Sequence, residues 1–131
     1  MNLEYLTVER IIENNLFVLN LIKVKKADKA ELLNRSRLVE IVEGCKDIEG
    51  DIYEKAAFLL VSLIHKHPFA SGNRRTAFVT AKEFLLLNKG KFHITDNPDN
   101  SRIMVGIREG FYSIEEIKDW IKHGKIREFK R

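Results

Sequence analysis

The sequence predicts an all-α protein, a compact bundle of about six helices forming a single domain over residues 1–131. The chain contains only seven glycines and two prolines, too few for a β-rich fold with many tight turns. Apolar residues recur three and four positions apart, as they do on the buried face of a helix. Hydrophobic residues make up 44% and charged residues 32% of the chain, which is the balance of a folded globular protein and excludes a disordered one.

Apolar spacing and end signals predict the first two helices. One runs from about Val8 to Ile22, with Thr7 in the N-cap position. A second lies within Ala30–Glu43 and is expected to end at Gly44. The polar segment 23–29 between them is predicted to be a loop.

The next two helices are the most apolar of the chain. Asp51 and Glu54 form a capping-box pattern that opens the third helix. Pro68 ends it, because a proline disfavours helical geometry in the residue before it. This helix is apolar nearly all round, so it is predicted to be the central buried one. A fourth helix is predicted from residue 73 or 74 to about Leu87, ended by Gly90.

The C-terminal part is predicted to hold two shorter helices. Lys91–Ile94 resembles a short extended segment, and a fifth helix is centred on Ile103–Ile107 and closed near Gly110. Ser113 and Glu116 form a second capping-box pattern, which opens a last helix that ends before Gly124.

Charge and composition exclude several classes of function. Lys and Arg total 23 against 19 Asp and Glu, a formal charge of +4, which mostly favours solubility. The basic clusters at 23–29 and at the C-terminus lack interleaved aromatic residues apart from Phe129, so nucleic-acid binding is a minor alternative. No apolar run approaches the roughly 20 residues that cross a bilayer, and no signal peptide is recognisable. With Cys45 as the single cysteine, the expectation is a cytoplasmic protein without an internal disulfide.

The residues with the clearest chemical potential lie at 65–77, in the segment HKHPFASGNRRTA. Gly72 and Asn73 stand at the start of a predicted helix, where unpaired backbone N–H groups form an anion cradle. Arg74 and Arg75 add fixed positive charge and forked donors suited to phosphate. His67, a few residues earlier, could accept a proton from a nucleophile brought to that phosphate.

A purely structural interpretation of the same residues stays open. Asn73 could be only a cap, Gly72 only a turn residue, and His67 only the last residue of a helix. However, a cation near a helix N-terminus is unfavourable by roughly 0.3–1 kcal/mol. The adjacent pair Arg74 and Arg75 therefore favours a bound anion that offsets both charges.

The string HPFASGNRRTA resembles the signature of the Fic/Doc family, H-x-F-x-(D/E)-G-N-(G/K)-R, and is most similar to its Doc (death-on-curing) branch. The matching residues are His67, Phe69, Gly72, Asn73 and Arg75. The resemblance implies an all-α fold in which the motif loop joins two central helices. It also implies an enzyme that transfers AMP or a phosphate from ATP to a hydroxyl of a target protein.

Roles for individual residues follow from the same resemblance. His67 would be the base that deprotonates the target hydroxyl, and Phe69 would anchor the loop in the core. The groups that would hold phosphates belong to four consecutive residues, Gly72, Asn73, Arg74 and Arg75.

Ser71 departs from the signature, because it stands where the family has a carboxylate that holds Mg²⁺. Mg²⁺ prefers carboxylate and phosphate oxygens, so Mg²⁺ binding is expected to be weak here. A catalytically degenerate module that keeps the fold is therefore an alternative to the enzyme.

A second departure distinguishes the two reactions. AMP-transferring members have glycine where Arg74 stands and a second arginine where Phe78 stands, whereas Doc-type members have lysine and an apolar residue. The resemblance therefore favours a Doc-like toxin that phosphorylates a protein such as a translation factor, with AMP transfer as the alternative. Doc-type proteins also imply a small antitoxin protein as partner, docked on an apolar groove. The stretch Ser36–Glu40 matches only part of the inhibitory pattern (S/T)-x-x-x-E-(G/N), and is interpreted as helix surface.

The remaining residues of chemical interest are expected to be structural. His65 is predicted to be a helix side chain near the site, and His93 and His123 surface residues without metal-ligand partners. Cys45 has no neighbouring base and is expected to be unreactive. Trp120 has helical spacing with apolar neighbours and is predicted to be core.

Overall fold

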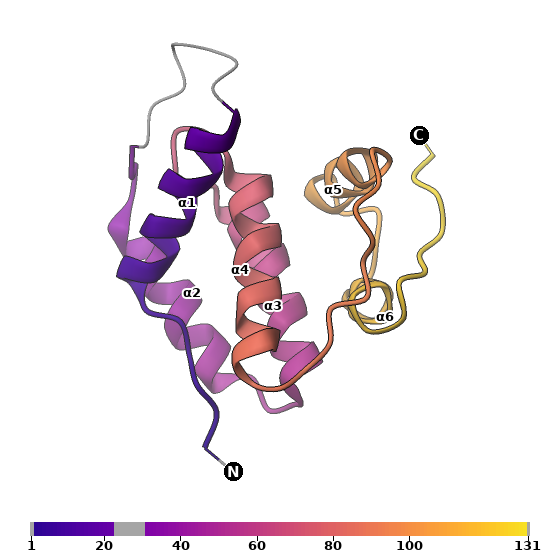
Figure 1. Ribbon diagram of the computed structural model, residues 1–131, viewed down its shortest axis with the longest axis horizontal. Coiled ribbons are helices and arrows are strands. Elements are labelled where there is room, and N and C mark those ends of the chain that lie inside the picture. Colours follow the sequence, from indigo (N-terminus) through magenta and orange to yellow (C-terminus); the bar gives the residue numbers. More distant parts are fainter. Residues whose placement is uncertain (1, 23–30, 131) are drawn as a thin grey trace.

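The computed structural model describes residues 2–22 and 31–130, and within them it confirms an all-α bundle without strands. The segment 23–29, expected to be a loop, lies outside the described ranges. Figure 1 shows α3 and α4 in the centre, with α1 and α2 on one side and α5 and α6 on the other. The helices are α1 (Val8–Ile22), α2 (Arg35–Asp47), α3 (Ile52–Lys66), α4 (Asn73–Leu87), α5 (Asn100–Arg108) and α6 (Ile114–His123).

Helix α3 is the centre of the fold, as its composition predicts. It packs against α2, α4, α5 and α6. The Asp51 side chain caps it by accepting hydrogen bonds from the N–H groups of Tyr53 and Glu54. Both α3 and α4 contain alanines with no exposed surface, which allow the two backbones to approach closely. These alanines are Ala56, Ala57, Ala77 and Ala81.

The start of α2 differs from the prediction. Of the predicted range Ala30–Glu43, the described residues 31–34 precede the helix, which begins at Arg35 with Asn34 as the N-cap; the Asn34 side chain accepts from the Arg37 N–H. The residues before it take another role, because Leu32 forms an isolated antiparallel bridge with Phe69. Leu32 is therefore part of a long-range pairing that helical periodicity does not reveal.

The end of α2 also differs, because the helix continues through Gly44 to Asp47. A Cβ at position 44 would lie 2.6 Å from Cζ of Phe58, so the glycine gives room to that ring. Lys55 caps the end of the helix. This residue is 4% exposed, and its Nζ donates hydrogen bonds to the carbonyls of Cys45 (2.9 Å) and Ile48 (2.7 Å). A cation at the negative end of the helix dipole stabilises this longer helix.

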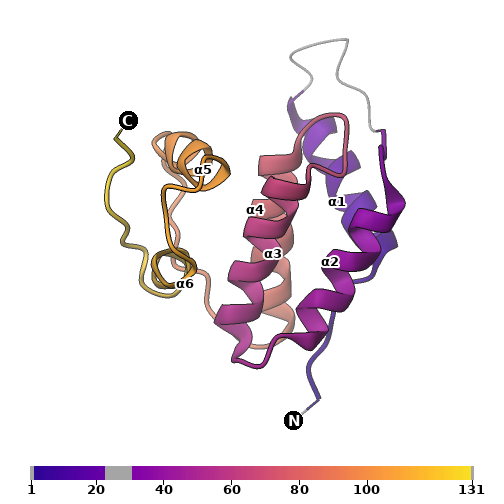
Figure 2. The same cartoon turned by 180° about the vertical axis from the view of Figure 1, so that it is seen from behind.

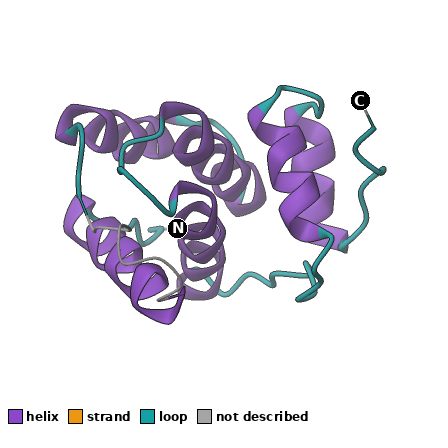
Figure 3. Cartoon of the chain, turned by 90° about the horizontal axis from the view of Figure 1, so that it is seen from above, coloured by secondary structure: helices purple, strands orange, loops and turns teal. Residues whose placement is uncertain are grey.

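The two C-terminal helices form a layer of their own (Figure 3). Helix α5 contains the predicted residues Ile103–Ile107, and α6 opens with the capping box expected at Ser113. Segment 91–94 is not a strand; its His93 N–H donates to the Ile121 carbonyl. The chain after α6 folds back onto α5, where Phe129 covers Gly106. Trp120 is 3% exposed and belongs to the core, as predicted.

None of the helices in the described ranges combines the length and apolar composition that crossing a bilayer requires.

Candidate active site

The motif residues form the loop that joins α3 to α4, beside the C-terminal half of α1 (Figures 1 and 2). Helix α3 ends at Lys66, and its C-cap residue His67 adopts the left-handed conformation with φ 49° and ψ 58°. This conformation costs a non-glycine residue about 1–2 kcal/mol, although histidine is among the residues that adopt it most often. Gly72, with φ 77°, is the second left-handed residue and precedes α4. The loop therefore turns sharply at both ends.

Asn73 holds the loop together from inside. Its Oδ1 accepts from the Phe69 N–H at 3.0 Å, and its Nδ2 donates to the Phe69 carbonyl at 2.8 Å and to Nδ1 of His67 at 3.1 Å. The two contacts with the Phe69 backbone determine which amide atom is oxygen and which is nitrogen. Both Nδ2 protons are used within the loop, so the group that Asn73 offers to an anion is its backbone N–H.

The contact with Asn73 also determines the tautomer of His67. Because Nδ1 accepts a hydrogen bond, the neutral ring carries its proton on Nε2. His67 itself is exposed. For Nε2 to receive a proton from a hydroxyl, the ring proton must first move to Nδ1, and that requires the bond to Asn73 to open.

The opposite side of the loop is paired with residues 31–34. The Leu33 N–H donates to the Pro68 carbonyl at 2.8 Å, and the Ala70 N–H donates to the Glu31 carbonyl at 2.9 Å. Phe69, between these contacts, is 1% exposed and belongs to the core. Backbone pairing and burial together leave Phe69 little freedom to move.

Helix α1 contributes a residue that sequence reasoning missed. Asn15 is 1% exposed, and its Nδ2 donates to the Ser71 carbonyl at 2.8 Å and to Oγ1 of Thr76 at 3.1 Å. The neighbouring Asn14 donates to Oγ1 of Thr80 at 3.2 Å, also in α4. Two adjacent asparagines within an amphipathic helix are a detectable signal, because buried amides need specific partners.

The start of α4 has the features of an anion-binding site. The helical hydrogen bonds begin with the Thr76 N–H, which donates to the Gly72 carbonyl. The N–H groups of residues 73–75 precede it and have no partner within the helix. Arg74 and Arg75 are exposed, and the first turn carries no acidic residue. A left-handed residue followed by a helical turn, with the positive end of the helix dipole, forms a concave site for an anion.

The residues do not fit a metal held by the protein itself. Ser71, half-buried at the motif's acidic position, offers a hydroxyl rather than a carboxylate. In the described residues, no group of three or more His, Cys, Asp or Glu could hold a metal ion. Positive charge at this loop comes from N–H groups and from guanidinium groups.

Other residues of chemical interest lie apart from this site or have structural contacts. Nε2 of His65 lies 2.7 Å from the Ile107 carbonyl and ties α3 to α5. His93 and His123 are exposed. Burial raises the pKa of the Cys45 thiol to about 11, so the thiolate that a reactive cysteine needs is disfavoured. Glu40, in the partial inhibitory pattern, forms an exposed ion pair with Lys66.

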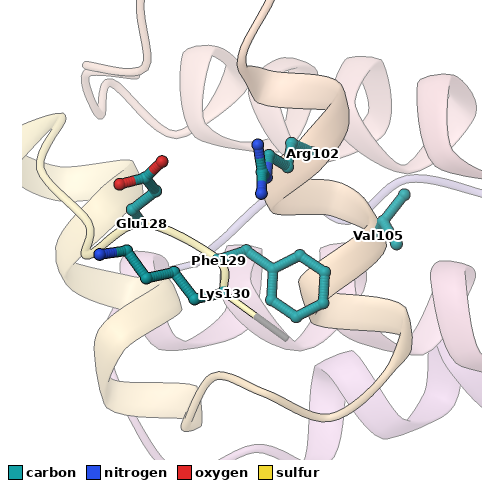
Figure 4. A pocket seen from close by; sticks show the side chains of 5 residues that line it. All are labelled: Arg102, Val105, Glu128, Phe129 and Lys130. Atoms are coloured by element: carbon teal, nitrogen blue, oxygen red, sulfur yellow. The ribbon is translucent and has the colours of Figure 1, made fainter.

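Two clefts elsewhere on the surface contain none of the motif residues. One, of about 610 Å³, lies between α5 and the C-terminal segment (Figure 4). The other, of about 670 Å³, lies between α1 and α4. Arg102, Val105, Glu128, Phe129 and Lys130 line the first. The second is lined by Arg10, Glu13, Asn14, Phe17, Val79, Lys82, Glu83, Leu86 and Leu87.

Comparison with known proteins agrees with the motif. A search of curated proteins found no match. The model of the Fic/DOC family matches residues 23–85, just under half of the chain. The matched segment includes α2, α3, the motif loop and most of α4. This match, on the segment that forms the loop and the central helices, supports membership of the Fic/DOC family.

Proposed function

We propose that this protein is a Doc-like toxin that transfers the γ-phosphate of ATP to a hydroxyl side chain of a target protein. The observation that carries the proposal is the link through Asn73, whose side chain holds His67 while its backbone begins the anion-binding turn of α4. A candidate base and a phosphate cradle thus belong to one hydrogen-bonded unit.

In the proposed reaction the target hydroxyl oxygen attacks the γ-phosphorus, and the bond to the β-phosphate oxygen breaks. His67 takes the hydroxyl proton after its contact with Asn73 opens, and ADP leaves. The N–H groups of residues 72–75 and the guanidinium groups of Arg74 and Arg75 stabilise the charge on the phosphates. No metal ligand is assigned to the protein, because Ser71 cannot supply a carboxylate.

Phosphate transfer is preferred to AMP transfer because of two residues. Phe78 is half-buried and packs edge-on against Phe92, with ring centroids 5.0 Å apart. It occupies the position of the second arginine in AMP-transferring members, so no phosphate contact is available there. Arg74 supplies the positive charge that Doc-type members have at its position.

Labelled ATP tests the proposal. The protein is incubated with a cell extract and ATP labelled at either the γ or the α position. The proposal expects γ-label on a protein with the wild type and with His93→Asn, the same change at an exposed histidine away from the loop. His67→Asn is expected to give none, since asparagine tolerates the left-handed backbone but lacks the imidazole. Label from the α position alone would establish AMP transfer instead.

Ser71 favours a second candidate function, a binding module that has lost catalysis. Such a protein would bind nucleotide without transferring label. The variant Ser71→Asp restores the motif carboxylate and is expected to gain magnesium-dependent transfer if the rest of the site is competent. If neither the wild type nor Ser71→Asp transfers label, the binding module is the better description.

The toxin proposal includes an antitoxin partner. The cleft between α1 and α4 exposes apolar surface of the kind such a partner would cover, including Phe17 (55% exposed) and Leu86 (58% exposed). Expression of the protein alone is expected to arrest growth, and co-expression of a small protein encoded next to it is expected to relieve the arrest. Equal arrest by the wild type and by His67→Asn would contradict catalytic toxicity.

A further inference from the structure

Asn15 fastens the motif loop to α1, although it lies outside the motif and outside the segment that matches the Fic/DOC family. Its buried Nδ2 donates one hydrogen bond to the Ser71 carbonyl (2.8 Å) and another to Oγ1 of Thr76 (3.1 Å). The first contact holds the loop, and the second holds the first turn of α4. The loop and helix are therefore held in one arrangement by one amide.

The contact with Ser71 sets the direction of the next N–H group. The peptide bonds of the described chain are trans, and in a trans peptide the C=O and N–H point in opposite directions. Because the Ser71 carbonyl points to Asn15, the Gly72 N–H points away from α1. Within the described ranges, the Gly72 N–H makes no hydrogen bond.

Side chains of α1 also pack closely against the backbone at Gly72. A Cβ at this position would lie 3.1 Å from Cδ2 of Leu19 and 3.3 Å from Nδ2 of Asn15. The peptide between Ser71 and Gly72 is thus confined on the side of α1. Rotation of this peptide would break the Asn15 bond and would carry the Gly72 N–H out of the anion site.

We infer that Asn15 is a positioning residue, which aims the Gly72 N–H at the anion bound by the start of α4. The inference rests on the proposed function for the identity of that anion. The orientation of the peptide, however, is a property of the ligand-free protein and can be measured there. Asn15 touches neither the nucleotide nor the reacting atoms in this account; it acts through the loop.

Two variants and one matched control separate positioning from general stability. Asn15→Asp keeps the shape and can still accept from the Thr76 hydroxyl, but its oxygens repel the Ser71 carbonyl. Asn15→Leu keeps the branching and removes both bonds. The control is Asn14→Leu, because Asn14 is 4% exposed in the same helix and donates to Thr80 and Glu83 without contacting the loop.

The first measurement uses the ligand-free full chain. Amide resonances of Gly72 and Asn73, and the hydrogen exchange rate of the Gly72 N–H, are compared among the variants by NMR. Both Asn15 variants are expected to shift or broaden the Gly72 resonance, whereas Asn14→Leu leaves it at its wild-type position even with a similar loss of thermal stability. If the Asn15 variants leave Gly72 unchanged, or change it no more than Asn14→Leu, the inference is overturned.

The second measurement is the affinity for ATP and for pyrophosphate by calorimetry. Loss of one well-aimed donor is expected to weaken binding roughly tenfold in both Asn15 variants, with wild-type affinity in Asn14→Leu. Wild-type affinity in the Asn15 variants would overturn the inference and leave the proposed function intact. If the wild type itself binds neither ligand, the proposed function fails, and the Gly72 resonance still decides whether Asn15 orients the peptide.

Discussion

Asn73, from within the motif loop, and Asn15, from α1, hold the loop through amide hydrogen bonds. Asn73 uses its whole amide inside the loop, on Phe69 and His67. Asn15 reaches Ser71 from a helix more than fifty residues earlier in the chain. Backbone groups that such side chains satisfy are costly to leave unpaired when they are buried.

Replacement of Asn73 by alanine tests the first of these contacts. Asn73→Ala leaves the N–H and the carbonyl of buried Phe69 without their partner, so the free energy of unfolding is expected to fall by roughly 2–4 kcal/mol. Urea denaturation followed by circular dichroism measures the change. Asn73→Ala is also expected to weaken ATP binding, because the first turn of α4 loses its connection to the loop.

Asn88 provides a matched control for Asn73→Ala. Its side chain likewise makes three hydrogen bonds, here all with backbone groups, two with Glu4 and one with Phe84, but it lies half-buried at the opposite end of α4. Asn88→Ala is expected to lower the free energy of unfolding by roughly 1 kcal/mol and to leave the affinity of the protein for ATP unchanged. Equal losses of stability in the two variants would contradict the special role given to Asn73.

The tautomer of His67 can be observed directly. The contact with Nδ2 of Asn73 places the ring proton on Nε2 in the neutral side chain. Long-range ¹H–¹⁵N spectra of the ligand-free protein are expected to show a protonated Nε2 and an unprotonated Nδ1. Asn73→Asp is expected to reverse the pattern, because its carboxylate accepts a hydrogen bond from a protonated Nδ1 and so favours that tautomer. A wild-type ring protonated on Nδ1 would show that the Asn73 contact is absent in solution.

At the scale of residues, the position of the motif loop was predictable from the local sequence. The hydrogen bonds that hold the loop in place were not. The spacing of His67, Gly72 and the two arginines identified the loop and the start of α4. The role of Asn15 depends on how α1 packs on α4, which a local sequence pattern does not encode. Asn73 was predicted as an anion ligand, whereas its side chain is directed to Phe69 and His67.

At the scale of elements, the helix ends show what local signals can predict. The start of α6 was predictable, because the Ser113–Glu116 capping box is a local pattern. The end of α2 was not predictable in this way, because the Lys55 ammonium, which belongs to the next helix, caps the carbonyls beyond Gly44. Leu32, inside the range predicted for this helix, lies outside it for a similar reason, since Leu32 pairs with distant Phe69.

The segment after α6 is held by a titratable contact. Arg127 donates to the Glu116 carboxylate and to the Phe111 carbonyl, and it lies over the Phe111 ring. The Arg127 hydrogen bond, followed by the Ser113 N–H, lowers the pKa of Glu116 from 4.5 to about 2. A carboxylate whose pKa is lowered on folding stabilises the folded protein. Its contribution to the free energy of unfolding is fully present above pH 4.5 and is lost as the pH falls through about 2.

The pH dependence of this contact can be measured by ¹³C NMR of the Glu116 carboxyl group. The wild-type midpoint is expected at about 2, with the segment docked throughout the range above it. In Arg127→Met the midpoint is expected to rise toward 4.5. Lys125→Met removes a cation from the same segment and is expected to leave the midpoint low. A wild-type midpoint near 4.5 would mean that Arg127 does not hold the segment in solution.

At the scale of the whole molecule, the layered bundle holds the motif loop at one end of the two central helices (Figure 1). Helix α1 and residues 31–34 fasten it by hydrogen bonds, and His65 links the end of α3 to α5. The two surface clefts lie elsewhere. The fold thus places the exposed Arg74 and Arg75 in the first turn of α4, directly after a loop with a restrained backbone, which suits catalysis by positioning and charge.

A titration of the isotope-labelled protein with ATP, followed by amide resonances, tests the central claim most directly. Saturable shifts are expected at Gly72, Asn73, Arg74 and Arg75, and they are expected to weaken when both arginines are replaced by methionine. If saturating ATP leaves these four resonances unmoved, or moves only residues of the cleft between α5 and the C-terminal segment, the start of α4 is not a phosphate site.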